Sequence, residues 1–154
     1  MKAWRIDKDQ YIGSVPAGEG PRLVGGRWNS PGLPAVYAAS HLSLSILEIL
    51  VHAKTSEQRR ARRSRAELDI PEELIEVLGG GKLPADFSPR TGYGVSQALG
   101  DEWLKSQRTP VLVVPSALVP EEQCVLLNPL HSSYAKCRWG GFVSIEIDSR
   151  LWAV

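Results

Sequence analysis

The chain has 154 residues, an apolar content of 43%, a charged content of 23% and a formal net charge of +1. These values are ordinary for one soluble globular domain with a substantial core. The near-neutral charge gives no polyelectrolyte surface for nucleic acid, and no apolar run reaches the roughly 18 residues of a membrane span. The N-terminus lacks a signal-peptide stretch, and Cys124 and Cys137 make no disulfide framework, so we expect a cytoplasmic protein.

The first third of the chain predicts two short strands and one apolar helix. Residues 3–6 and 35–38 have the composition of strands, whereas the stretch 13–34, rich in Gly and Pro, is predicted to be loop. Ser40 is the predicted N-cap of a helix that runs to about Lys54. Because this helix is apolar nearly all round, we expect it to be central and its Glu48 not to be freely solvated.

The remainder of the chain predicts short strands with few helices. Residues 59–65 contain five arginines, residues 66–70 form a strand, and Pro71 opens a short helical turn toward Leu78. A second helix is predicted from Ser96 to Ser106. Residues 111–114 and 125–127 are core strands by composition, and the alternation over 142–148 indicates a last strand. This order predicts one domain of the α/β or α+β type with a sheet of mixed strand directions.

Most catalytic signatures are absent. Leu23 stands where a dinucleotide-binding GxGxxG needs its last glycine, and Leu83 stands where a phosphate loop needs Ser or Thr. The chain has no CxxC, HExxH or GxSxG motif. The three histidines lack metal-ligand spacing, so no metal site is expected: His41, His52 and His131.

One group of residues does indicate chemistry. Gly25 and Gly26 allow the backbone a close approach, and Arg27 follows with a guanidinium that pairs bidentately with phosphate or carboxylate. Glu48 places a carboxylate on an apolar helix, where it needs a function or a partner, and His52 lies one helical turn further on. Together they suggest a pocket for an anionic ligand, with one acid facing it.

Each member of this group also has a structural interpretation. Arg27 would stack on Trp28 at the surface, Tyr37 would belong to the core, and Glu48 would pair with an arginine. Ser116, after a proline at a strand end, would be a turn residue. The arginines of residues 59–65 would form a solvated loop, or alternatively a docking patch for an acidic partner or nucleic acid.

In its motifs the sequence resembles the RES-domain toxins of bacterial toxin–antitoxin pairs. The matching segments follow one another in family order: GGRWN at 25–29, PG at 31–32 with Tyr37, LE at 47–48 with VH at 51–52, GDEWL at 100–104, VPS at 114–116, LNP at 127–129 with His131, and Asp148 with RL at 150–151. Two positions depart from the family pattern without touching the proposed chemistry. Phe87 stands where Trp is common, and Ser149 stands where Pro is common.

The resemblance implies a single RES domain over residues 1–154, with an α/β core similar to ADP-ribosyltransferase toxins and attack on the nicotinamide–ribose bond of NAD+. It implies four catalytic residues, namely Arg27, Tyr37, Glu48 and Ser116. Substrate binding is assigned to Trp28, Asn29, His52 and Asn128. NAD+ is then the substrate, and no separate cofactor is expected. The implied partner is an Xre-like antitoxin that occludes the pocket, in a complex built on toxin dimers, without membrane binding or direct nucleic-acid binding by the toxin alone.

The residues fit this chemistry. Arg27 suits the phosphates of NAD+, and Glu48 would stabilise the positive charge that develops on the ribose. The ring of Tyr37 would stack on nicotinamide, and Ser116 would hydrogen-bond the carboxamide or ribose. The sequence leaves three functions open. Water or inorganic phosphate as acceptor gives NAD+ degradation, a protein acceptor gives ADP-ribosylation, and the arginine run alone would give a non-catalytic binding module.

Overall fold

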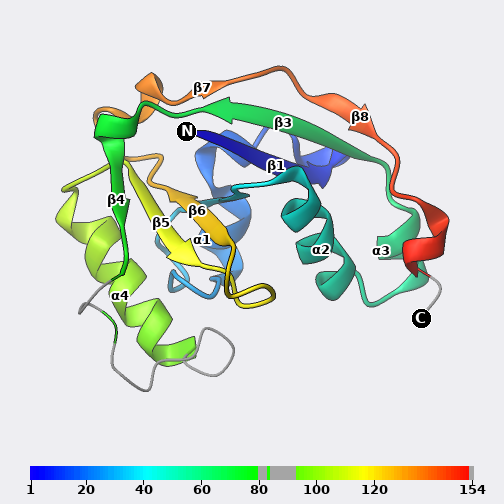
Figure 1. The fold of residues 1–154 in the computed structure, drawn as a ribbon, viewed down its shortest axis with the longest axis horizontal. Coiled ribbons are helices and arrows are strands. Elements are labelled where there is room, and N and C mark those ends of the chain that lie inside the picture. The colour runs from blue at the N-terminus through cyan, green and yellow to red at the C-terminus, as the bar shows by residue number, and fades with distance from the viewer. Residues whose placement is uncertain (80–82, 84–92, 153–154) are drawn as a thin grey trace.

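A sheet of eight strands forms the frame of the structure, a computed structural model that describes residues 1–79, 83 and 93–152 (Figure 1). The strands are β1 Lys2–Lys8, β2 Val36–Ala39, β3 Arg63–Asp69, β4 Ile75–Val77, β5 Val111–Pro115, β6 Gln123–Leu127, β7 Arg138–Trp139 and β8 Val143–Ile145. The helices are α1 Glu19–Val24, α2 Leu42–His52, α3 Ser56–Arg60 and α4 Tyr93–Ser106, with short 3₁₀ turns η1 Asp9–Tyr11, η2 Val15–Ala17, η3 Glu72–Leu74, η4 Tyr134–Lys136 and η5 Ser149–Trp152. This mixed α/β architecture confirms the predicted fold class.

The sheet is curled and mixed in direction. Its strands follow the order β4-β5-β6-β2-β1-β3-β7, with β8 also paired to β3. β4 and β5 are parallel, and the other neighbouring pairs are antiparallel. In Figure 1, β3, β7 and β8 run across the top of the view, whereas β4, β5 and β6 run steeply downward. β1 and β2 are joined through the pair Trp4↔Ala39, and a cleft opens beside this junction.

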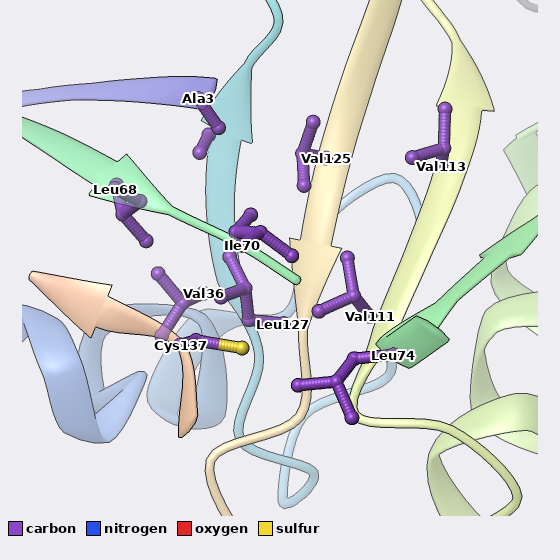
Figure 2. Close-up of a cluster of buried hydrophobic side chains, with 11 residues drawn as sticks. Ala3, Val36, Leu68, Ile70, Leu74, Val111, Val113, Val125, Leu127 and Cys137 are labelled. Atoms are coloured by element: carbon purple, nitrogen blue, oxygen red, sulfur yellow. The ribbon is translucent and has the colours of Figure 1, made fainter. Parts of the chain in front are cut away.

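The core lies on both faces of the β5–β6 pair. Val111 and Val113 of β5 face a cluster that also contains Leu68 of β3 and Cys137, drawn in Figure 2. The alternate residues of β5 face the opposite side, where Trp103 of α4 covers them. Because both faces are buried, these strands read as continuous apolar runs. The predicted core strands and the apolar side of the second helix are therefore confirmed.

The helix that carries Glu48 is less central than its composition predicts. α2 packs against β1 and β2, but among its residues only Leu44 and Ser45 are buried. Leu47 is 40% exposed and Val51 is 52% exposed, and Val51 also lines the cleft. None of the helices within the described ranges is long and apolar enough to cross a membrane.

Several element boundaries differ from the prediction. His41, with extended backbone, takes the N-cap position of α2 in place of Ser40. The predicted loop 13–34 contains η2 and α1, and α1 carries an Arg22–Glu19 ion pair. β3 begins within the arginine run, and the predicted strand 142–148 is reduced to β8. β4 and β7 are short strands defined by pairing with a neighbour rather than by composition. Phe87 lies outside the described residues.

Candidate functional site

A cleft of about 590 Å³ lies between α2, the junction of β1 with β2, and the loop that carries Arg27. This volume is typical of a small-molecule site. Five of the residues predicted for the site line it, namely Arg27, Trp28, Tyr37, Glu48 and His52. Three others do not: Asn29, Ser116 and Asn128.

The loop before Arg27 is shaped by a glycine that touches Tyr37. A Cβ added to Gly26 would lie 2.5 Å from the Tyr37 hydroxyl oxygen and 2.8 Å from Oδ1 of Asn29. The preceding Gly25 has φ of +75°, which favours glycine, and caps the end of α1. The close approach inferred from the glycine pair is therefore made to the protein's own tyrosine.

Tyr37 and Asn29 fix this loop from beneath. The Tyr37 hydroxyl donates to Asn29 Oδ1 at 2.7 Å and accepts from the Trp28 backbone N–H at 3.0 Å. Asn29 is fully buried, and its Nδ2 donates to backbone carbonyls of Pro21 and Leu33. Burial raises the pKa of Tyr37, so its phenol stays neutral. The hydroxyl of Tyr37 is thus engaged in structure, while its ring lines the cleft.

Helix α4 clamps the same loop from the outside. Nε2 of Gln97 donates to the carbonyls of Gly26 and Asn29 at 3.2 and 3.1 Å. The Asp101 carboxylate accepts from the backbone N–H and the hydroxyl of Ser30 at 2.7 and 2.6 Å. The two bonds to the Asp101 carboxylate are charge-assisted, and together with those of Gln97 they hold the loop from Gly26 to Ser30.

The clamp also brings an aromatic ring to Arg27. The ring of Tyr93, at the start of α4, lies 5.3 Å from the Arg27 guanidinium carbon. Such cation–π contacts orient an arginine without neutralising its charge. Tyr93 lines the cleft as well, and no sequence motif marks it because its role comes from the packing of α4.

Glu48 enters the cleft from α2 with two partners. Its Oε2 lies 3.6 Å from Nε2 of His52, one turn later on the same helix. Its Oε1 accepts a hydrogen bond from the thiol of Cys124 at 3.7 Å. The Glu48 side chain is 32% exposed, so it is half-buried and still open to the cleft. The predicted contact between Glu48 and His52 is present.

Cys124 is a cleft residue that sequence reasoning missed. It lies on β6, between Ala39 of β2 and Val114 of β5, and lines the cleft beside Glu48. Burial raises the pKa of the thiol to about 12, with a further contribution from the Glu48 charge, whereas Arg27 lowers it. The charges of Glu48 and Arg27 therefore act on the thiol in opposite directions. No motif marks this cysteine, because only strand pairing brings it to Glu48.

The remaining two predicted site residues, Ser116 and Asn128, are buried and hydrogen-bonded to the backbone. Ser116 Oγ accepts from the backbone N–H groups of Leu118 and Val119 at 3.1 and 3.2 Å. Asn128 donates from Nδ2 to the carbonyl of Leu104, and its Oδ1 accepts from a turn N–H. Both residues are at most 1% exposed and neither lines the cleft, so their contact with a ligand stays a prediction.

The arginine run is largely structural. Arg63 is buried and donates to the carbonyls of Gln58, Arg59 and Ala61 at the end of α3. Its guanidinium also lies under the ring of Trp152 in η5, at 5.7 Å. Arg65 lies over Trp4, whereas Arg60 and Arg62 are exposed.

The electrostatics of the cleft favour an anion. Among the described residues that line it, cationic side chains outnumber carboxylates by four to two: Arg5, Lys8, Arg27 and Arg63 against Asp7 and Glu48. A concave surface with this imbalance concentrates anionic ligands. Arg27 and Glu48 therefore share a cleft that is positive overall.

These features define a small α/β domain with a cleft suited to an anionic ligand and one carboxylate in its wall. The sequence matches the RES domain family over residues 2–140, so the chain belongs to that family, as predicted. Toxin Res of Photorhabdus laumondii is 38% identical over 152 residues, covering 98% of this chain and 97% of the relative. Toxin Res of Yersinia enterocolitica is 36% identical over 137 residues, covering 89% and 90%.

A further relative carries a more specific name. The Prs ADP-ribosylating toxin of Sphingobium sp. strain YBL2 is 40% identical over 133 residues, covering 83% of this chain and 82% of the relative. Each of these three relatives is named as a toxin, and the match covers 82% or more of its length.

Proposed function

We propose that this RES-domain protein is a toxin that arrests growth by breaking the nicotinamide–ribose bond of NAD+, through hydrolysis or phosphorolysis. The observation that carries the proposal is the presence of Arg27 and Glu48 on the lining of one cleft of about 590 Å³. The family membership and the toxin relatives support the biological role.

In this proposal Arg27 binds the substrate and Glu48 stabilises the transition state. Arg27, oriented by Tyr93, pairs with a phosphate of NAD+. Glu48 faces the ribose and stabilises the positive charge that develops as the glycosidic bond breaks. Nicotinamide leaves as a neutral base from a cationic precursor, so the step requires no strong general acid. His52 and Cys124 hold the two oxygens of Glu48.

A second candidate function uses the same bond but another nucleophile. If a protein side chain attacks in place of water or phosphate, the enzyme is a mono-ADP-ribosyltransferase. The specific observation in its favour is the 40% identical relative named as an ADP-ribosylating toxin. Both candidates require the same side chains on NAD+.

A toxin of this kind requires an inhibitor in the cell that makes it. We expect an Xre-like antitoxin that occludes the cleft, within a complex built on toxin dimers. NAD+ serves as substrate, with no additional cofactor.

The test is NAD+ consumption and nicotinamide release by purified protein free of antitoxin, with and without inorganic phosphate. We expect wild type to consume NAD+ and Glu48→Gln to lose at least ~100-fold in kcat. Glu57→Gln, an exposed carboxylate on α3, is the matched control and should retain activity. ADP-ribose or its phosphorylated form identifies the acceptor.

Labelled NAD+ incubated with cell lysate separates the two candidates. A labelled protein band that disappears in Glu48→Gln supports ADP-ribosylation. Intact NAD+ under all conditions, together with no labelled protein, would refute both candidates.

A further inference from the structure

Ser116 has hydrogen-bonding capacity left over. A serine hydroxyl offers two acceptor positions and one proton. Both acceptor positions of Ser116 are filled by the backbone N–H groups of Leu118 and Val119. The side chain is fully buried, so its proton needs an acceptor inside the protein rather than in solvent.

The register of β5 with β6 identifies that acceptor. Val114 pairs directly with Cys124, and Ser116 follows Val114 by two residues, so its side chain lies on the same face as the cysteine. The Ser116 backbone N–H also donates to the carbonyl of Glu122 at 3.0 Å, so the pairing of β5 with β6 continues as far as Ser116. The nearby Ser116 hydroxyl lowers the pKa of the Cys124 thiol. This register therefore offers the sulfur of Cys124 as an acceptor for the serine proton.

The thiol proton then points away from Ser116. Cys124 donates it to Oε1 of Glu48 at 3.7 Å. Burial, followed by the charge of Glu48, raises the pKa of the thiol to about 12, so sulfur keeps this proton at neutral pH. The Cys124 thiol therefore donates to Glu48, and the acceptor positions of Ser116 are already filled by two N–H groups. Among the described residues, the sulfur of Cys124 is then left as an acceptor for the Ser116 hydroxyl.

We propose that Ser116 and Cys124 form a directed hydrogen-bond chain, from Ser116 Oγ–H to Cys124 Sγ and from Cys124 Sγ–H to Glu48 Oε1, that positions the Glu48 carboxylate in the cleft. Ser116 and Cys124 are then positioning residues that act through Glu48, and neither needs to touch NAD+. The catalytic consequence rests on the proposed function, whereas the hydrogen-bond chain itself does not.

The chain is tested directly by the infrared S–H stretching bands of the intact protein. Cys124→Ala and Cys137→Ala assign the two bands, since the chain has two cysteines. We expect the Cys124 band to lie at the lower frequency, and to move to higher frequency in Glu48→Gln and in Ser116→Ala, because each change weakens a hydrogen bond of the sulfur. The band of Cys137, which lies in the core away from the cleft, should not move.

Activity measurements test the consequence for Glu48. Cys124→Ala should lower kcat for NAD+ cleavage roughly three- to tenfold with little change in KM, because the carboxylate loses a donor that orients it. Cys124→Ser keeps both the donor and the acceptor, so it should recover at least half of the lost activity. Cys137→Ala is the matched control and should keep the wild-type kcat.

The infrared test and the activity test can each contradict a different part of the proposal. A Cys124 band that stays in place in either Glu48→Gln or Ser116→Ala overturns the hydrogen-bond chain, whatever the enzyme activity. Equal kcat in wild type, Cys124→Ala and Cys124→Ser overturns the positioning role. A wild type that leaves NAD+ intact refutes the proposed function, and the infrared bands still decide the chain. Because Ser116→Ala also removes the acceptor of two turn N–H groups, Cys124→Ala carries the kinetic comparison.

Discussion

The contact between Gly26 and the Tyr37 hydroxyl explains why glycine precedes Arg27. The backbone at Gly26 fills the space that a side chain would take, and Tyr37 simultaneously holds the Trp28 N–H. The position of Arg27 therefore depends on the packing of the Tyr37 hydroxyl beneath the loop. At the residue scale, the site is built by close packing around the loop as much as by its charges.

Replacing Gly26 by Ala should destabilise the protein and weaken the site. The added Cβ would lie 2.5 Å from the Tyr37 oxygen, so the loop or the tyrosine must move. We expect a loss of about 1–3 kcal/mol in the free energy of unfolding, measured by urea denaturation, and a raised KM for NAD+. Gly13→Ala, where a Cβ meets nothing within 4 Å, should be nearly neutral. Equal effects of the two substitutions would contradict this account.

Residue identity predicted some parts of the site better than others. Arg27 and Glu48 were recognisable because an arginine after two glycines and a carboxylate on an apolar helix are unusual in themselves. Ser116 and Asn128 were expected at the ligand, but the structure places them in backbone hydrogen bonds. Cys124 had no sequence signal, since its contact with Glu48 arises from the pairing of strands distant in the chain.

At the scale of elements, α4 acts as a clamp on the loop of Arg27. It carries Gln97 and Asp101, which hold the loop by side-chain hydrogen bonds. It also carries Gly100, where an added Cβ would lie 1.8 Å from the carbonyl oxygen of Trp28. The helix can approach the loop this closely only because position 100 has no side chain.

Gly100→Ala should therefore destabilise the protein, although alanine is the better helix former by about 1 kcal/mol. Backbone atoms block the new Cβ, so we expect a net loss of about 2–4 kcal/mol in thermal or urea unfolding. Gly94→Ala in the same helix meets nothing within 4 Å and should be neutral or slightly stabilising. A stabilised Gly100→Ala protein would show that α4 does not approach the loop this closely.

The segment containing α3 and the start of β3 gives a second prediction at this scale. Arg63→Met removes a guanidinium that donates to three carbonyls, so we expect a loss of about 1.5–3 kcal/mol in stability. Arg62→Met, at an exposed position of the same run, should change stability by less than ~0.5 kcal/mol. Urea denaturation of both variants is the measurement. Equally small effects of the two substitutions would contradict the structural role of Arg63.

At the scale of the whole molecule, buried neutral acids set the response to alkaline pH. Burial raises the pKa of Cys124 to about 12 and that of Cys137 to about 11, from a reference value of 9.0. The unfolded chain therefore releases these protons at a lower pH than the native protein does. Stability from this source is fully present below about pH 9 and is lost as pH rises toward the native pKa values.

We expect the free energy of unfolding to be flat near neutral pH and to fall between about pH 9 and pH 11. Each thiol steepens the slope by at most ~1.4 kcal/mol per pH unit. Urea denaturation across this range is the measurement, and Cys137→Ala should flatten the decline because one titrating group is gone. A stability curve that is constant up to about pH 11 would contradict burial of these thiols in neutral form.

The sequence by itself determined the mixed α/β class, the apolar core strands, the membership of the RES domain family and the candidates Arg27 and Glu48. These follow from local composition, periodicity and the order of motifs, which need no knowledge of contacts. Only the tertiary structure decided that α2 is half exposed, that Tyr37 supports the loop, and that Cys124 lies against Glu48. Strand register and the curl of the sheet bring these residues together, and neither is encoded in any short stretch of the chain.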